Sequence, residues 1–133
     1  MRRPLIALSV MALLVGLAAG CGDRGPTRYR VSGTVTFQGK PVPLGAIQFT
    51  PDTSKGNRGP AAFAGIKNGR YDTAASGQGF VGGPQVVTVD AFDGVIVDPD
   101  LLPSGKPLLK NQYRKSFDLP KDKDAPLDIE LSE

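Results

Sequence analysis

The sequence of 133 residues contains no histidine, no tryptophan and a single cysteine. Without histidine the chain cannot form a Ser-His-Asp or Cys-His catalytic site, and it lacks the most common ligand of catalytic zinc. Glutamate occurs only at Glu130 and Glu133, close to the C-terminus. Catalysis would therefore depend on paired aspartates or on a Ser-Lys pair, and neither can be placed from the sequence. We expect a protein that is not an enzyme.

The residues that are present describe a turn-rich globular protein. Hydrophobic residues make up 40% of the chain, charged residues make up 22%, and there are 17 glycines and 12 prolines. This composition is not typical of a disordered protein or of a collagen-like protein. The formal net charge is +3, of which Arg2 and Arg3 supply two charges. Because the remaining basic residues are scattered, nucleic acid is not an expected partner.

The N-terminus has the pattern of an export signal. Arg2 and Arg3 precede residues 5–17, which are apolar except for Ser9 and Gly16. This run is shorter than the ~20 residues of a permanent transmembrane helix. It ends in LAAGC at residues 17–21, which resembles the lipobox of bacterial lipoproteins, although Ala18 stands where leucine is most common.

The lipobox resemblance implies cleavage between Gly20 and Cys21, and it implies a lipid on Cys21. The alternative is an ordinary secretory signal in which the cysteine is incidental. A lone cysteine favours lipidation, because an exported chain cannot pair it internally. Gly22 follows the cysteine, where many lipoproteins of the inner membrane have aspartate, so the outer membrane is favoured. We expect residues 1–20 to be the signal, 21–28 a lipidated tether and 29–133 one domain.

The domain has the alternation of short β-strands. Polar and apolar residues alternate over residues 29–38, and a similar period of two returns in later segments. Asn68-Gly69 between two such runs is a strong hairpin signal. The expected strands are residues 29–38, 46–50, 61–66, 70–73, 85–92, 113–119 and 127–131, with residues 42–45 as a connection. Seven short strands without an amphipathic helix predict an all-β, antiparallel β-sandwich.

Several segments of this domain form a series that points to one family. The run VSGTVTFQGKPVP at residues 31–43 is followed by FTPD at 49–52, SKGN at 54–57 and IKNGRYDT at 66–73. The series resembles carboxypeptidase regulatory-like domains, which are transthyretin-like sandwiches, and especially the small lipoproteins of planctomycete bacteria. The resemblance implies a folding or interaction module, or a surface-exposed unit, and it implies no activity.

Two loops are candidate ligand sites. Four aspartates within eleven residues, Asp90, Asp93, Asp98 and Asp100, could supply oxygen ligands to Ca²⁺, although their spacing is not that of an EF-hand. The alternative is that these aspartates form turns and are solvated. Lys55, Asn57 and Arg58 lie in a loop rich in glycine that could bind an anion through its backbone, or could be a plain exposed loop.

Two further patterns have structural interpretations that we prefer. The glycines of residues 77–83 suit a chain that crosses between sheets, with a mobile binding loop as the alternative. Five aromatic residues on strand faces are expected in the core rather than on a platform for sugars. They are Tyr29, Phe37, Phe49, Tyr71 and Phe92.

These observations predict a membrane-anchored envelope lipoprotein with a binding or structural module. Its expected partners are the membrane, through the lipid anchor, and an envelope protein or a polysaccharide. No cofactor is expected apart from Ca²⁺ at the aspartate loop. One alternative is a glycan-acting envelope enzyme, or a subunit of one, that uses Asp carboxylates. Another is a carrier of a small hydrophobic ligand between the sheets.

Overall fold

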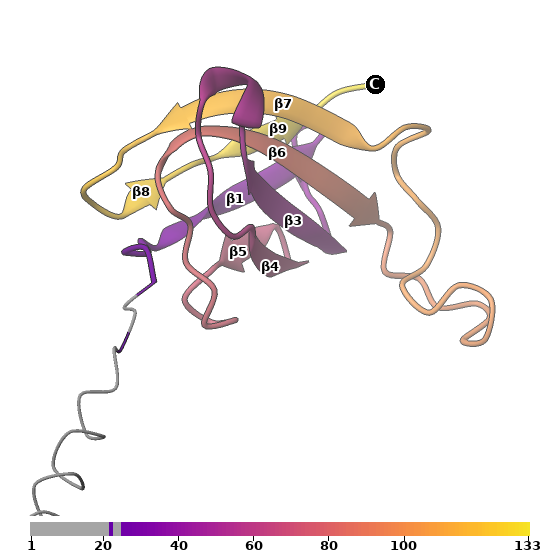
Figure 1. Cartoon of the computed structure of the whole chain (residues 1–133). Helices are drawn as coiled ribbons and strands as arrows, with labels where there is room; N and C mark the ends of the chain where they lie inside the picture. Colours follow the sequence, from indigo (N-terminus) through magenta and orange to yellow (C-terminus); the bar gives the residue numbers. More distant parts are fainter. Residues whose placement is uncertain (1–21, 23–24) are drawn as a thin grey trace, which may run out of the picture.

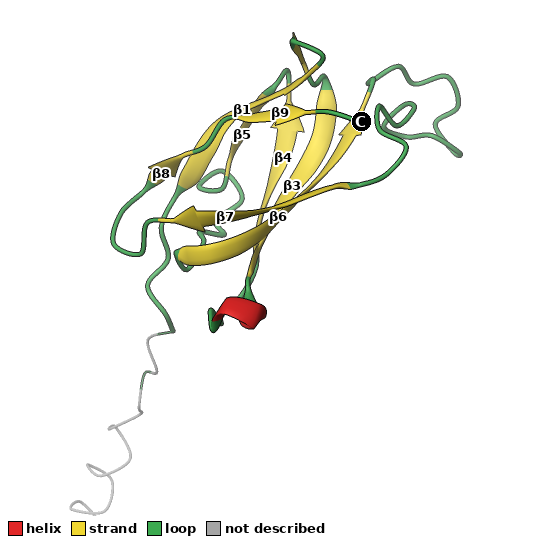
Figure 2. Ribbon diagram, turned by 90° about the horizontal axis from the view of Figure 1, so that it is seen from above, coloured by secondary structure: helices red, strands yellow, loops and turns green. Residues whose placement is uncertain are grey.

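The domain is built almost entirely of β-strands, as shown in Figures 1 and 2. The computed structural model describes Gly22 and residues 25–133. The strands are β1 (Val31–Phe37), β2 (Lys40–Pro41), β3 (Leu44–Pro51), β4 (Ala62–Lys67), β5 (Arg70–Asp72), β6 (Gly83–Phe92), β7 (Tyr113–Leu119), β8 (Ala125–Pro126) and β9 (Ile129–Leu131), with a 3-10 turn η2 (Thr53–Lys55) after β3. The all-β class predicted from the sequence is confirmed.

The strands form one strongly curled sheet. Its order is β2-β1-β5-β4-β3-β6-β7, with neighbours antiparallel, and β8 and β9 both pair with β1. The curl brings β1, β8 and β9 over β3, β4 and β6, so the sheet has two facing layers like a sandwich (Figures 1 and 2). β6 lies between β3 and β7, so it is paired on both sides.

Two-residue turns join two of the hairpins, and the sequence predicts the one at Asn68-Gly69. Asn68 and Gly69 have φ of 50° and 72°, and Gln38 and Gly39 have φ of 51° and 75°. Positive φ at both central residues matches the twist of a two-residue hairpin. The hairpin signal at Asn68-Gly69 is therefore confirmed.

The end of the domain departs from a purely antiparallel arrangement. We expected one closing strand over residues 127–131, but β8 and β9 are separate and both run parallel to β1. The pairing with β1 is interrupted at Leu127 and Asp128, which form hydrogen bonds to side-chain or backbone groups outside this strand pairing. The Leu127 carbonyl accepts a hydrogen bond from the Tyr71 hydroxyl at 2.6 Å, and the Asp128 carboxylate accepts one from the Thr34 amide at 2.8 Å.

Residues 42–45 were expected as a connection, and this prediction is wrong in part. Leu44 and Gly45 belong to β3, and Val42 is completely buried. Pro41 lies in β2 at the edge of the sheet, where a missing amide donor leaves no partner unpaired. The prolines therefore interrupt the pairing for only two residues.

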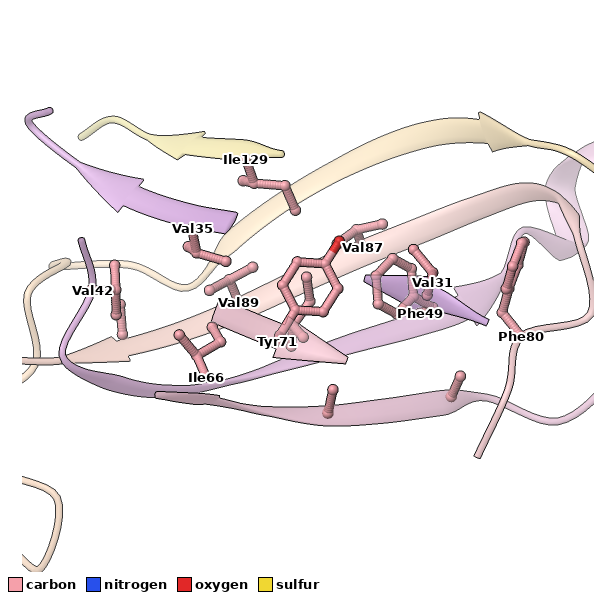
Figure 3. Close-up of a cluster of buried hydrophobic side chains, with 14 of the residues drawn as sticks. Val31, Val35, Val42, Phe49, Ile66, Tyr71, Phe80, Val87, Val89 and Ile129 are labelled. Carbon is pink, nitrogen blue, oxygen red and sulfur yellow. The ribbon is translucent and has the colours of Figure 1, made fainter. Parts of the chain in front are cut away.

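The core lies between the two layers, as Figure 3 shows. Val35 of β1 and Ile129 of β9 face Val87 and Val89 of β6, and all four side chains are buried. Phe49 and Tyr71 lie between them with ring centroids 6.0 Å apart. These side chains belong to one continuous hydrophobic cluster of the described residues.

The aromatic residues follow the prediction with one exception. Phe49 and Tyr71 are buried, and Tyr29 and Phe37 pack against the core with part of their surface exposed. Phe92 is half-buried on the outer face of β6. Side chains alternate along the strand, so Phe92 points away from the face that carries Val87, Val89 and Ala91. Phe80, in the glycine-rich crossing, is completely buried and pairs with Tyr29 through two backbone hydrogen bonds of 2.8 and 2.9 Å.

Candidate functional site

The four candidate calcium ligands are not brought together. Among the described residues, no three His, Cys, Asp or Glu side chains form a group able to hold a metal ion. Asp90 lies on the outer face of β6, where its two carboxylate oxygens accept hydrogen bonds from Gln112 Nε2 at 3.0 and 2.9 Å. The side chain of Asp100 is exposed to solvent.

Asp93 and Asp98 organise the long excursion between β6 and β7. Asp93 Oδ1 accepts hydrogen bonds from the amides of Val95 and Lys106, both at 2.9 Å, and so closes the base of the excursion. Asp98 Oδ1 accepts from the amides of Asp100 and Leu101 at 3.0 and 3.2 Å. Both carboxylates therefore serve the local backbone, as the turn-forming alternative describes.

The candidate anion loop is divided between the surface and the interior. Lys55 and Arg58 are exposed, whereas Asn57 points inward. Asn57 Nδ2 donates hydrogen bonds to the carbonyls of Gly82 and Pro84 at 2.8 and 2.7 Å. These bonds fasten the loop to the start of β6. The structure thus gives Asn57 a structural role and does not unite it with Lys55 and Arg58 in one site.

Asp52 precedes this loop and caps the η2 turn. It is almost completely buried, and its Oδ1 accepts hydrogen bonds from the amide and the hydroxyl of Ser54. These bonds hold the pKa of the Asp52 carboxyl below its usual value. The negative charge at Asp52 lies in the same loop as Lys55, which further weakens the case for an anion site there.

The outer face of the sheet carries a row of side chains that the sequence analysis did not single out. The pairing places Phe63 of β4 opposite Gln48 of β3, Gln48 opposite Thr88 of β6, and Thr88 opposite Arg114 of β7. Phe63 is 45% exposed and is the one aromatic side chain among the exposed large hydrophobic residues of the described part of the chain. We call these four residues the outer row. They combine an exposed aromatic ring with an amide, a hydroxyl and a guanidinium.

A hollow of about 620 Å³ lies over the polar part of the outer row. Gln48, Thr88 and Arg114 line it, and the adjacent cross-strand row adds Thr50, Val86 and Ser116. Most of these side chains can donate or accept hydrogen bonds. Gln48 Nε2 donates to the Thr50 hydroxyl at 3.1 Å, which orients the amide within the row.

A groove of about 810 Å³ opens on the other side of Phe63, between β4 and β5. β5 pairs with β1 through three residues but with β4 only where Arg70 lies opposite Lys67. The two strands diverge beyond this pair, and the space between them is the groove. Gly65 of β4 is part of its lining, and a Cβ added there would have no atom within 4 Å.

The groove carries more positive than negative charge. Its charged side chains are Arg30, Lys67, Arg70 and Asp72. Arg30 forms a two-point ion pair with Asp72, which also accepts a hydrogen bond from the Ala74 amide at 2.9 Å. The Arg30 guanidinium lowers the pKa of the Asp72 carboxyl, so Asp72 stays ionised at neutral pH. Lys67 and Arg70 have no ion-pair partner among the residues that the structure describes.

Tyr71 supports the wall of the groove from the inside. Its hydroxyl donates to the Leu127 carbonyl, and burial raises the pKa of the hydroxyl above its usual value. Tyr71 therefore stays neutral and keeps its proton for this hydrogen bond. The bond ties β5 to the segment between β8 and β9.

An exposed apolar loop lies between Asp93 and Lys106. It contains five of the six large hydrophobic side chains that are exposed in the described residues, namely Val95, Ile96, Val97, Leu101 and Leu102. The loop follows the end of β6, whereas the chain enters the domain before β1 at the opposite end (Figure 1). The sequence shows these residues only as short apolar runs among prolines and aspartates.

A carboxylate pair of the kind that glycosidases use is not assembled in these hollows. The groove contains Asp72 as its only carboxylate, and the hollow over the outer row contains Asp52. Two smaller hollows contain Asp90 and Glu133 respectively. Since general acid-base hydrolysis of glycans uses two carboxylates at one site, these four hollows do not support it.

The lipidation and cleavage predictions at Gly20 and Cys21 lie outside the described residues. So does the signal segment, residues 1–20. Within the described part of the chain, no helix has the length and apolar character needed to cross a bilayer. A comparison with protein-family models gives no match, and a comparison with curated proteins gives none either.

Proposed function

We propose that this protein is an exported, lipid-anchored binding module that holds a polysaccharide of the cell envelope on the outer face of its sheet. The observation that carries the proposal is the outer row, in which Phe63 stands exposed beside Gln48, Thr88 and Arg114. The module is non-catalytic. Its resemblance to carboxypeptidase regulatory-like domains agrees with this role, because that resemblance implies a folding or interaction module.

The chemistry of the outer row suits a sugar polymer. A sugar presents hydroxyl groups on its rim and C–H groups on its ring faces. The Gln48 amide, the Thr88 hydroxyl and the Arg114 guanidinium can exchange hydrogen bonds with the hydroxyls. The Phe63 ring offers an apolar surface to a ring face. Because the row is open and spans four strands, a chain can extend along it without having to enter a closed pocket.

The lipid anchor would hold this face close to a membrane. The domain begins at Tyr29, which pairs with Phe80. Seven residues lie between Cys21 and Tyr29, and the eight residue-to-residue steps that join them reach about 28 Å when fully extended. A lipid on Cys21 with two or three acyl chains gives stable binding to the bilayer, since each buried CH₂ contributes about 0.8 kcal/mol. The proposed location is the outer membrane, facing the periplasm or the cell surface.

The anchor predicts a specific chemical modification. Cells that express the full chain and grow with an alkyne fatty acid should incorporate the label into the protein, and the Cys21→Ala variant should lose it. The measurement is in-gel fluorescence after conjugation of the alkyne to a dye. Equal labelling of the two proteins would contradict the anchor, and Ser9→Ala in the signal serves as the control that should keep the label.

The outer row predicts glycan binding that depends on Phe63. In native gels that contain a polysaccharide and a nonionic detergent, the mature protein should be retarded by at least one of hydroxyethylcellulose, dextran and polygalacturonate. Phe63→Ala should weaken that retardation about three- to tenfold, the range expected for one aromatic contact. Val97→Ala removes methyl groups from a side chain that is 74% exposed elsewhere, so it should have no effect. Absence of retardation in all three gels would contradict the proposal, as would equal binding by Phe63→Ala and wild type.

A further inference from the structure

Lys67 and Arg70 form a like-charged pair in a position where such pairs are unfavourable. They lie directly opposite each other across the β4–β5 hairpin. Side chains in this relation have Cβ atoms about 5 Å apart, and two charges of the same sign destabilise the pair. Neither side chain has a carboxylate partner among the described residues, so nothing in the domain itself offsets the repulsion.

The hairpin holds this pair at a fixed spacing. The turn residues Asn68 and Gly69 donate backbone hydrogen bonds to the carbonyls of Pro43 and Val42, at 2.9 and 2.7 Å. The Gly69 carbonyl accepts a third from the Val35 amide at 2.8 Å. With its turn fastened to two other segments, the hairpin cannot open to separate the two cations. An anion between them would relieve the repulsion without any change of the backbone.

The groove next to the pair has space for such an anion. Lys67 and Arg70 line the groove, and Gly65 leaves part of it empty because it has no side chain. The Asp72 carboxylate does not compete for the two cations, because Arg30 and the Ala74 amide occupy its oxygens. The groove therefore presents two cations that lack a partner in the described domain, beside one carboxylate that is already neutralised.

The groove and the outer row are parts of one surface. Phe63, Gly65 and Lys67 alternate with buried residues along β4, so all three face outward. Successive outward residues of a strand are about 7 Å apart. The outer row and the outward residues of β4 thus share Phe63. A sugar chain that lies on the outer row and turns at Phe63 continues above Gly65, where a substituent reaches Lys67 and Arg70.

We infer that the polysaccharide is acidic and that Lys67 and Arg70 bind the carboxylates of its uronic acid residues in the groove between β4 and β5. This inference rests on the proposed function, because the outer row supplies the contacts to the rest of the sugar chain. The ion pairs are exposed, so the binding weakens as salt concentration rises.

The test compares polygalacturonate with its methyl ester, which keeps the sugar chain and lacks the charge. In affinity gels the mature protein in nonionic detergent should bind polygalacturonate at least tenfold more tightly than the ester. The double variant Lys67→Gln/Arg70→Gln should bind the two polymers equally. Lys106→Gln removes one exposed charge from the excursion between β6 and β7, which lines neither the groove nor the hollow over the outer row, and it should behave like wild type.

Three outcomes would overturn the inference. The first is equal binding of polygalacturonate and its ester by wild type, which needs no variant to fold. The second is an unchanged preference in the double variant when its circular dichroism matches wild type. The third is that polyaspartate or polyphosphate binds as tightly as polygalacturonate, because the cations would then select charge without the sugar. Binding of neutral glycans without an acidic preference would refute only the groove, whereas failure of every glycan would refute the proposed function as well.

Discussion

Replacing Gly33 by valine should destabilise the domain by more than about 4 kcal/mol, which is beyond the usual range of single substitutions. A Cβ at Gly33 would lie 2.0 Å from the Leu127 carbonyl oxygen and 2.6 Å from its carbon. Both are backbone atoms, so no side chain can rotate away to make room. The segment between β8 and β9 would have to leave β1, and its hydrogen bonds to Thr34 and Tyr71 would break. Urea unfolding followed by far-ultraviolet circular dichroism measures the loss.

Gly65→Val is the matched control for this prediction. It makes the same chemical change in another strand, at a position where a Cβ meets no atom within 4 Å. Because glycine weakens a strand interior and valine favours it, this variant should be as stable as wild type or more stable by up to about 1 kcal/mol. Equal destabilisation by the two valines would show that the close approach at Gly33 is not what matters.

Replacing Asn57 by alanine should cost about 1–3 kcal/mol, because two hydrogen bonds to carbonyls are lost and each contributes about 0.5–1.5 kcal/mol. Each carbonyl keeps a second donor, Gln85 Nε2 in one case and the Asp52 amide in the other. The carbonyls belong to Gly82 and Pro84, at the point where the glycine-rich crossing becomes β6. Gly82 and Gly83 have φ of 76° and 77°, so the backbone there is held in a conformation that most residues avoid. The measurement is the midpoint of thermal unfolding together with the urea-derived free energy.

Lys55→Ala and Arg58→Ala provide the comparison for Asn57. Both side chains are exposed, and their loss should change the free energy of unfolding by no more than about 0.5 kcal/mol. This contrast separates the structural role of Asn57 from the anion-binding role suggested by its neighbours in the sequence. An Asn57→Ala variant as stable as Arg58→Ala would contradict the structural role.

The strands could be predicted because their signals are local. Alternation identified β1 and β6, and Asn68-Gly69 identified the hairpin between β4 and β5. The exposed position of Phe63 was also within reach of the sequence, since Ala62, Ala64 and Ile66 alternate with Phe63, Gly65 and Lys67. Its flanking alanines are small, and they hid the pattern of a buried face.

The groove and the role of Asn57 could not be predicted, because both depend on segments that are distant in the chain. The groove exists because β5 pairs with β1 over three residues and with β4 at only one residue pair. The three residues of β5 contain no local pattern that specifies which neighbour the strand pairs with. The partners of Asn57 lie 25 and 27 residues further on. The parallel pairing of β8 and β9 likewise depends on polar groups of Leu127 and Asp128 that meet β5 and β1 only after the chain has closed on itself.

The pairing of β1 with β8 and β9 also sets the order in which the domain can form. The carboxylates that bind the amides of Arg30 and Thr34 lie 94 residues further along the chain. The first strand therefore cannot complete its layer until nearly the whole domain has been synthesised. Domains with such long-range contacts fold slowly. Under the proposed export, this delay would keep the polypeptide extended during translocation and would leave folding to the far side of the membrane.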